Sequence, residues 1–294
     1  MSEYVLSCES TVDVSAETLD EFSIAYIPFH FFIDDEEYAD DLGKTVPYDE
    51  FYQRMVDGAM TRTAAIGVGE YHEYFRPFLE QGKDILHVSL SSGLSGTYES
   101  ACTAAQELAG QFPERTIRIV DSLGASAGYG LLMVTLAERR DAGASLQELY
   151  EWAEANKLRM HHEFFSTDLT FYIRGGRVKP ISGFVGNLLN ICPLLDMDAK
   201  GTLVPREKIR SKNKVIRRIV DKMEGYADGG TGYAGRVFIS NSACIDDARA
   251  VAELVKQRFT GIKDSVRISS IGTTIGSHTG PGTVALFFWG SERA

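Results

Sequence analysis

The sequence predicts an α/β protein of two domains, the first with a largely parallel sheet and the second with a mixed or antiparallel one. Three observations predict this class. The first half of the 294-residue chain alternates apolar runs with amphipathic helical patterns, which is typical of a parallel sheet with helices on both faces. In the second half the predicted elements follow a different order, which includes a hairpin and consecutive strands. An apolar content of 44% supplies a substantial buried core.

In the first domain, placed at residues 1–160, each predicted strand is an apolar run and each predicted helix carries apolar residues at helical spacing. The predicted strands cover residues 3–7, 24–34, 84–90 and 116–122. The predicted helices cover residues 15–22, 48–58, 70–82, 97–110, 126–143 and 145–157. The last of these helices leads out of the domain.

The second domain is placed at residues 161–294. A hairpin is predicted over residues 191–207, around a turn at residues 198–201. The other predicted strands cover residues 160–166, 236–241, 264–272 and 283–290, and the predicted helices cover residues 207–226 and 246–259. The first of these helices has one apolar stripe, formed by Ile216, Ile219, Val220 and Met223.

Composition excludes several classes of function. A net charge of −11 disfavours nucleic acid or an anionic membrane as the main partner, although transient membrane contact stays open. The 4 cysteines form no C-x-x-C pair, which argues against a zinc cluster and favours a reduced cytoplasm. We see no signal peptide and no apolar run long enough to span a membrane. We therefore expect a cytoplasmic protein without a nucleic-acid partner.

The stretch VSLSSGLSGTYESA, residues 88–101, joins a predicted strand to a predicted helix. The first N–H groups of a helix are unpaired and carry the positive end of its dipole. Glycines such as Gly96 let a ligand approach the backbone, and serines such as Ser92 add short neutral donors. This turn therefore suits a phosphate or a carboxylate. The alternative is that its serines and threonines only cap the helix and bind no ligand.

Three other segments also place hydroxyl groups at a strand end or at a helix start. They are residues 10–13, 61–65 and 121–128. Because the carboxyl ends of parallel strands lie at one edge of the sheet, these segments are expected to converge on one crevice. Convergence favours a ligand site over a set of unrelated helix caps.

Four motifs in this order resemble the DegV family of fatty-acid-binding proteins: LSSGLSGTYESA, VDSLGASAGYGLL, RGGRV and GSHTGPGTVALFF. The resemblance runs from Ser10 to Phe288. It implies two α/β domains with an acyl chain buried between them. It also implies the role of the acyl-carrying subunit of a bacterial two-part fatty acid kinase. The expected partners are then a long-chain fatty acid and the ATP-binding subunit of that kinase, and no cofactor is expected.

The resemblance also implies particular ligand contacts. The family holds the carboxylate with a threonine of a TSQP-like turn and a serine of the LSGTY turn, which correspond to Thr63 and Ser95. This sequence reads TAAI at the first turn, so Thr61 is an alternative to Thr63. Arg177 of GGRV and His278 of GSHTGPG are expected near the head group, where a cation favours the doubly charged acyl phosphate over the acid.

Burial of an acyl chain explains why such a site needs both apolar and polar parts. Each buried methylene contributes about 0.8 kcal/mol, whereas a carboxylate stranded in an apolar slot is strongly unfavourable. Candidate lining residues are Phe184 and Leu188, one helical turn apart, with room left beside them by Gly183 and Gly186. A plain core role is the alternative for these apolar residues.

The alternative function is that of an enzyme, a serine hydrolase. Residues 124–128, GASAG, match G-x-S-x-G with a strand before and a helix after, so Ser126 is the candidate nucleophile. Asp168 or Asp196 and then His278 would complete the hydrolase order of Ser, Asp and His. Against it, residues 121–123 separate Gly124 from the apolar run, so Ser126 is not expected on the sharp turn.

No P-loop and no G-x-G-x-x-G after a strand occur, so ATP would have to come with a partner. The acidic run at residues 34–41 is read as a solvated loop rather than a Mg²⁺ site, and no metal site is expected. The basic stretch at residues 206–218 is a candidate docking surface for an acidic partner such as the kinase, with a solvated helix face as the alternative. A small-anion module without an acyl slot is the third class.

Overall fold

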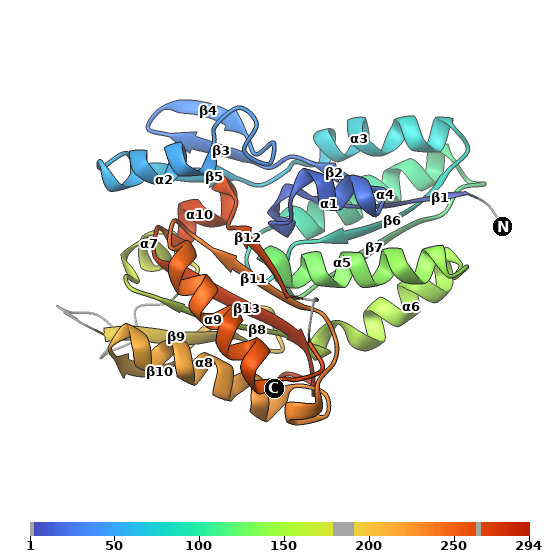
Figure 1. Ribbon diagram of the computed structural model, residues 1–294. Helices are drawn as coiled ribbons and strands as arrows, with labels where there is room; N and C mark the ends of the chain where they lie inside the picture. Colours follow the sequence, from blue (N-terminus) through green and yellow to red (C-terminus); the bar gives the residue numbers. More distant parts are fainter. Residues whose placement is uncertain (1–2, 179–190, 263–265) are drawn as a thin grey trace.

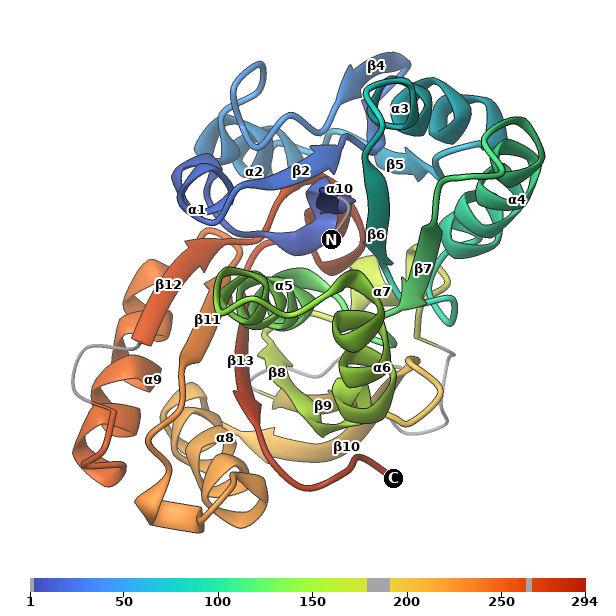
Figure 2. The same ribbon diagram turned by 90° about the vertical axis from the view of Figure 1, so that its right-hand side faces the viewer.

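The computed structural model describes residues 3–178, 191–262 and 266–294, whose strands form three sheets (Figure 1). The first sheet is parallel, in the order β2-β1-β6-β7, and β6 is buried at every position. Helices α3 and α4 lie on one side of it and α5 and α6 on the other (Figure 2), as the continuous apolar runs predict. Its strands are β1 (Tyr4–Glu9), β2 (Ile24–Ile27), β6 (Asp84–Ser89) and β7 (Ile117–Asp121). The helices of this part are α1 (Ala16–Glu21), α3 (Val68–Glu80), α4 (Thr97–Gln111), α5 (Ser126–Asp141) and α6 (Leu146–Asn156).

A small antiparallel sheet, in the order β4-β3-β5, corrects two sequence predictions. The single strand predicted over residues 24–34 is wrong: it breaks at Pro28, which has a fixed φ and no N–H to donate. Its second half is β3 (His30–Ile33), which pairs with β4 (Glu36–Ala39) and β5 (Thr61–Ala64). The acidic run read as a loop therefore contains a strand, β4, although that strand is mostly exposed. Helix α2 (Tyr48–Val56) packs on this sheet.

The third sheet is mixed, in the order β10-β9-β8-β13-β11-β12, which confirms the predicted character of the second half. The predicted hairpin is present as β9 and β10, and residues 207–210 belong to β10 rather than to the following helix. Two short helices, α7 and α10, were not predicted. The strands are β8 (Met160–Ser166), β9 (Ile191–Met197), β10 (Leu203–Arg210), β11 (Val237–Asn241), β12 (Val266–Ser270) and β13 (Thr283–Trp289). The helices are α7 (Thr170–Arg174), α8 (Lys212–Tyr226), α9 (Ile245–Arg258) and α10 (Thr273–Thr279).

Helix α5 joins the two larger sheets into one body (Figures 1 and 2). It is buried along most of its length and contacts β8, β11 and β13 of the mixed sheet. The approach requires a glycine, because a Cβ at Gly128 would lie 2.3 Å from Nε2 of His162. One hydrophobic core consequently contains residues of both halves, such as Leu86 and Phe287. The division at residue 160 remains a prediction.

Short 3-10 helices complete the fold: η1 (Ser10–Val12), η2 (Lys157–Arg159) and η3 (Gly230–Gly232). Among the residues that the structure describes, no helix combines the length and the hydropathy that a membrane span requires.

Candidate functional site

A partly enclosed cavity lies where the three sheets meet. Its volume is about 170 Å³, which is room for roughly six water-sized groups at about 30 Å³ each. The lining is mostly apolar, with side chains contributed from distant parts of the sequence. The principal apolar lining residues are Phe29, Leu90, Leu94, Phe164, Met197 and Phe287.

Polar side chains also line this cavity, and four of them are Thr63, Ser95, Arg177 and His278. The cavity is therefore amphipathic. Its apolar walls can contact a hydrocarbon chain, and its hydroxyl groups and guanidinium can hydrogen-bond to an anionic group.

The serine-glycine turn predicted to hold an anion runs from Leu90 to Gly96 and leads into α4. Ser95 and Gly96 line the cavity. Ser92 does not belong to the described lining; its N–H donates to a carboxylate oxygen of Asp121 at 3.2 Å. Ser95 Oγ accepts the N–H of Thr97 at 3.3 Å, and within the described residues its hydroxyl hydrogen has no acceptor and can donate to a ligand.

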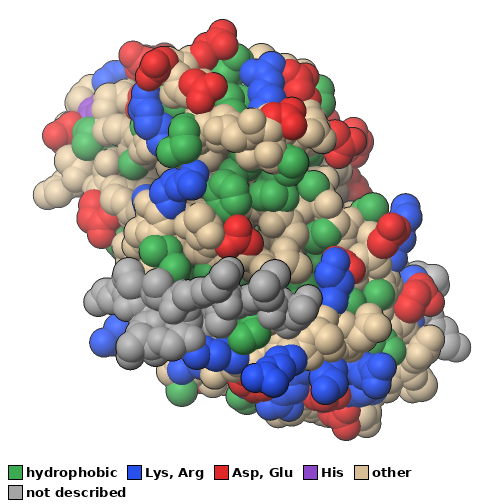
Figure 3. Space-filling model, turned by 90° about the vertical axis from the view of Figure 1, so that its left-hand side faces the viewer, with side chains coloured by type: hydrophobic (Ala, Val, Ile, Leu, Met, Phe, Trp, Pro, Cys, Tyr) green, Lys and Arg blue, Asp and Glu red, His purple; other side chains and the backbone are tan. Residues whose placement is uncertain are grey.

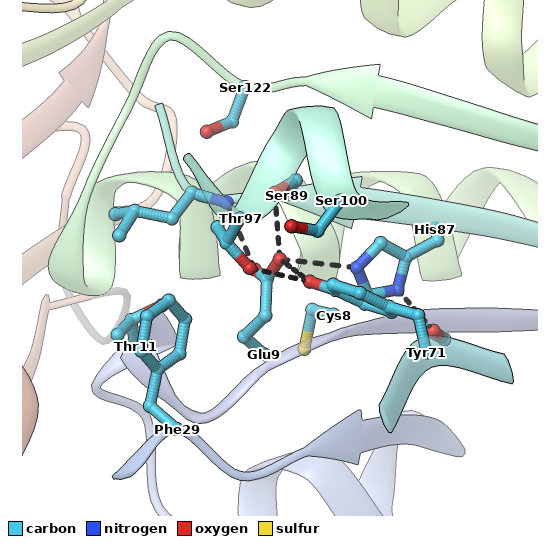
Figure 4. Close-up of polar contacts among 12 residues, drawn as sticks. Cys8, Glu9, Thr11, Phe29, Tyr71, His87, Ser89, Thr97, Ser100 and Ser122 are labelled. Atoms are coloured by element: carbon cyan, nitrogen blue, oxygen red, sulfur yellow. Dashed lines mark hydrogen bonds and ion pairs between the residues drawn. The ribbon is translucent and has the colours of Figure 1, made fainter. Parts of the chain in front are cut away.

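The carboxylate of Glu9, which no sequence motif indicated, lies beside Ser89 and Thr97, which flank this turn (Figure 4). Glu9 ends β1 and is fully buried. Burial alone raises the pKa of a carboxyl group, but hydrogen bonds and the charge of His87 outweigh it, so the pKa of Glu9 is lowered. Its partners are Tyr71 Oη at 2.7 Å, Ser89 Oγ at 2.7 Å, Leu90 N at 2.9 Å, Tyr129 Oη at 3.2 Å and His87 Nε2 at 3.2 Å.

These contacts hold both ends of the serine-glycine turn. At its start, the N–H of Leu90 donates to Glu9. At its end, the hydroxyl of Thr97 lies 2.9 Å from that of Tyr71, which also donates to Glu9. The position of Ser95 between them is consequently fixed by one buried carboxylate.

Thr63 and His278 meet at the polar end of the cavity. Thr63 Oγ1 lies 2.8 Å from Nε2 of His278. Burial, and then the charge of Arg177, lower the pKa of His278 to about 4, so the ring is neutral near pH 7. Thr61, the alternative carboxylate contact, lines an outer cleft instead, and its hydroxyl donates to the carbonyl of Ser277 at 3.4 Å.

Arg177 is the cation of this end of the cavity. Its Nε donates to the carbonyl of Leu94 at 3.2 Å, which places the guanidinium beside the serine-glycine turn. Its Nη1 donates to the carbonyl of Gly175 at 2.6 Å. Burial lowers the pKa of Arg177, but a guanidinium stays protonated at neutral pH.

The turns at residues 10–13 and 121–128 converge, as predicted. Ser126 Oγ donates to Asp13 at 2.5 Å and lies 3.0 Å from Ser240 Oγ. Contrary to the expectation that it would avoid the sharp turn, Ser126 has a φ of 54° at the start of α5. Its backbone is thus strained in the way that a nucleophile elbow is.

Ser126 and His278 both line the cavity, but within the described residues no hydrogen bond joins the predicted hydrolase residues to one another. Asp168 accepts the N–H and hydroxyl of Thr170, Asp196 pairs with Arg206 at 2.8 Å, and His278 contacts Thr63. A different serine, Ser7, lies 2.6 Å from Nδ1 of His87, whose other nitrogen contacts Glu9. All three of those side chains are fully buried, so no substrate reaches them.

His162 is a cavity residue that sequence reasoning missed. Its Nε2 accepts the N–H of Ala125 at 3.2 Å, so Nδ1 carries the hydrogen and donates to the carbonyl of Met160 at 3.0 Å. Burial, followed by the charge of Arg293, lowers the pKa of His162 well below its ordinary value. The neighbouring His161 faces the other side of β8 and stacks on Phe288, as strand alternation predicts.

The predicted lining residues Phe184 and Leu188 lie outside the described residues. The described lining of the cavity comes from other elements. Besides His162, it includes Thr274, Thr279 and Thr283, none of which the sequence analysis selected.

The fold is a two-domain α/β architecture, and its cavity has both an apolar and a polar lining. The chain matches the family model described as "Uncharacterised protein, DegV family" over residues 6–290. It is 32% identical over 293 residues to a DegV domain-containing protein of Clostridium perfringens, covering 100% of this chain and 99% of that one. The chain belongs to the DegV family, and the resemblance seen in the four sequence motifs is confirmed.

Two further likenesses concern lipids. A protein of Thermotoga maritima named "Fatty acid-binding protein" is 29% identical over 284 residues, covering 95% of this chain and 94% of that one. The fatty acid kinase B3 protein of Streptococcus pneumoniae, solved loaded with linoleic acid, superposes with a TM-score of 0.83 at 20% identity. That alignment covers 98% of this chain and 100% of the other, and it shows a shared fold.

Proposed function

We propose that this protein binds a long-chain fatty acid and presents its carboxylate to a separate kinase that forms an acyl phosphate. The observation that carries the proposal is the amphipathic cavity, with Thr63, Ser95, Arg177 and His278 on its lining. A fatty acid has the matching division into an apolar tail and one anionic group. The T. maritima relative, by its name, binds such a ligand.

In this proposal the tail supplies most of the affinity and the polar residues orient the head. Ser95 donates its hydroxyl hydrogen to the carboxylate, and Thr63 does the same while its oxygen accepts the Nε2 hydrogen of His278. Arg177 supplies the positive charge. A carboxylate held by charge-assisted hydrogen bonds avoids the cost of burying an unpaired charge.

The phosphoryl donor is assigned to a partner because the chain carries no nucleotide-binding motif of the P-loop or dinucleotide type. The S. pneumoniae neighbour, by its name, is part of a fatty acid kinase. Phosphorylation in this proposal therefore occurs at the mouth of the cavity, on the carboxylate, by a second protein.

The basic stretch at residues 206–218 is the proposed docking surface for that partner. Lys and Arg side chains gather along the lower part of the face drawn in Figure 3. Internal pairs use several cations of the stretch, including Arg206 with Asp196 and Arg218 with Glu207, both at 2.8 Å. Arg217 is exposed and has no ion pair among the described residues, so Arg217→Glu is the sharper charge reversal.

Two measurements test the proposal. Native mass spectrometry of protein purified from cells is expected to show a co-purifying long-chain acid, and a protein that binds only small anions would contradict it. Ser95→Ala is expected to weaken hexadecanoate binding about tenfold, the loss of one hydrogen bond to a charged group, and to leave hexadecanol binding unchanged. Ser100→Ala is the matched control, because the half-buried Ser100 lies about one turn along α4 and donates to the carbonyl of Gly96 at 3.3 Å.

A further inference from the structure

Helix α10 contributes several side chains to the acyl cavity, namely Thr274, Ile275, His278 and Thr279. The helix is only 7 residues long, and its sequence, TTIGSHT, is rich in threonine and glycine, which are poor helix formers. A helix this short is not stable by itself. Contacts with the rest of the fold therefore have to set its position.

Two buried carboxyl groups hold the start of α10. The N–H of Gly272, which precedes the helix, donates to Asp13 Oδ1 at 2.8 Å, and the N–H of Thr274 donates to Asp40 Oδ2 at 3.2 Å. Asp13 is 2% exposed and Asp40 is 1% exposed. Asp13 follows η1 and Asp40 follows β4, so both come from the first half of the chain, whereas α10 lies in the second half.

Asp13 also holds the start of α5. Its second carboxyl oxygen accepts the hydroxyl of Ser126 at 2.5 Å, and Ser126 lines the cavity. One buried carboxyl group consequently joins two walls of the cavity, because the start of α5 and the start of α10 both donate to it. The residue before Gly272 is held separately: Tyr52 Oη donates to the carbonyl of Ile271 at 2.8 Å.

The other end of α10 carries His278, whose Nε2 lies 2.8 Å from Thr63 Oγ1. The opposite edge of the ring packs closely against the end of α7, because a Cβ at Gly175 would lie 2.4 Å from Nδ1 of His278. The ring therefore has little room in which to move independently of its helix. Its hydrogen bond with Thr63 is kept only while α10 stays where its first N–H groups are bound.

Both contacts at the start of α10 need an acceptor oxygen rather than a negative charge. Burial raises the pKa of Asp13 well above its ordinary value, and burial also raises the pKa of Asp40. A backbone N–H can donate equally to a carboxyl or an amide oxygen. Oδ1 of Asp40 has no hydrogen-bond partner within the described residues, so an amide NH₂ can replace it without loss of a donor. Asparagine should therefore substitute for Asp40, whereas alanine should not.

We propose that Asp13 and Asp40 are positioning residues for the head-group end of the acyl cavity. By holding the start of α10, they keep His278 beside Thr63, and neither carboxyl group contacts the ligand itself. The inference deepens the proposed function and rests on it, because His278 and Thr63 lie beside the carboxylate of the bound acid in that proposal. A merely structural role would lower stability without changing the preference for an acid head group.

Calorimetric titration of delipidated protein with hexadecanoate and with hexadecanol tests the positioning role without any kinase. The readout is the ratio of the two affinities, because hexadecanol has the same tail but no carboxylate. In Asp40→Ala this ratio is expected to fall about fivefold. Asp13→Gly, in which glycine adopts the φ of 47° without strain, is expected to lose at least as much. Asp40→Asn is expected to recover most of the loss, because its amide oxygen still accepts the N–H of Thr274.

An NMR titration of His278 measures the position of α10 without any ligand. Burial, and then the charge of Arg177, keep the pKa of His278 at about 4 in the intact fold. In Asp40→Ala and Asp13→Gly, water is expected to reach the loosened ring and to raise this pKa toward the ordinary value of about 6.5. Asp40→Asn is expected to leave it close to that of the wild type.

The matched control is Asp84→Ala. Asp84 is 7% exposed and accepts the N–H of Thr116 at 2.9 Å, at the start of β6, whereas the cavity lies beyond the end of that strand. This variant is expected to lose stability but to change neither the affinity ratio nor the pKa of His278.

Wild-type values of both readouts in Asp40→Ala and in Asp13→Gly overturn the positioning role. The two variants are made separately, so that one that fails to fold leaves the other to be measured. An asparagine variant that shifts both readouts as far as the alanine variant also counts against the role, because the acceptor oxygen is retained. Wild-type protein that does not bind hexadecanoate overturns the proposed function instead, and the His278 titration then still tests how α10 is held.

Discussion

Two glutamates of this protein are almost equally buried, yet their surroundings differ. Glu9 at the end of β1 is 0% exposed, and Glu163 in β8 is 2% exposed. Glu9 accepts hydrogen bonds from several hydroxyls and a backbone N–H, whereas the carboxyl of Glu163 has no hydrogen bond within the described residues. Glu163 lies beside Asp196 in the β8–β9 register instead.

The comparison shows that, for these two equally buried carboxyl groups, the neighbouring hydrogen-bond donors and charges decide which one is ionised. Burial, followed by the charge of Asp196, raises the pKa of Glu163 to about 8. The pKa of Glu9 is lowered despite complete burial. The negative charge is therefore kept where it holds the serine-glycine turn and is suppressed where it faces another acid.

The largest expected effect is the loss of the Glu9 charge. In Glu9→Gln the amide NH₂ faces N–H and O–H donors, which then lose their acceptor in a buried site. We expect the free energy of unfolding to fall by about 3–5 kcal/mol, measured by urea denaturation. The control is Glu107→Gln, which removes the carboxylate partner of His72, a histidine more exposed than His87. It is expected to change the free energy of unfolding by less than about 0.5 kcal/mol. Equal effects of the two substitutions would show that the buried donors contribute nothing special.

Glu163→Gln is expected to increase the free energy of unfolding, by an amount that depends on pH. The folded protein keeps the Glu163 proton up to about pH 8, whereas the unfolded chain releases it near its ordinary pKa. Wild-type stability from this group is therefore present at low pH and is lost as the pH rises toward 8.

The glutamine variant lacks this loss, so it should gain roughly 4 kcal/mol over the wild type at pH 8 and little at pH 4. Thermal unfolding of both proteins between pH 4 and pH 8.5 measures the difference. A stability difference that is flat across this range would mean that Glu163 is ionised in the fold.

The smallest expected effect comes from a single donor to Glu9. Tyr71→Phe removes the hydroxyl that contacts both Glu9 and Thr97 and keeps the ring. We expect a loss of about 1–2 kcal/mol in the free energy of unfolding. Adding it to Glu9→Gln should cost less than the sum of the two single effects, because the residues share one network. Strict additivity in this double-mutant cycle would argue against a shared network.

The elements that sequence patterns predicted are those whose local signal and tertiary environment agree. Strand β6 is a continuous apolar run and is buried on both faces, and the β9–β10 hairpin carries a turn signal at Asp198 to Gly201. Helix α10 has no such signal, because threonine and glycine are poor helix formers. Its first N–H groups are instead satisfied by Asp13 and Asp40, which are more than two hundred residues away in sequence.

The same distinction applies to the candidate site. Ser95 and Gly96 could be chosen because a strand-to-helix turn presents them to a ligand by local geometry alone. Glu9 and His162 could not, because both act through partners that the fold supplies from other strands. Only the register of β8 with β13 decides which of two adjacent histidines faces the cavity.

Strand β13 carries a consequence for how the protein is made. It lies in the middle of the mixed sheet, between β8 and β11, although it follows both of them in the chain and is made after them. Until residues 283–289 emerge, β8 and β11 each present an unpaired, apolar edge, which is a hazard for aggregation during synthesis. The cavity, whose wall includes β13, can therefore close only after residues 283–289 have been made.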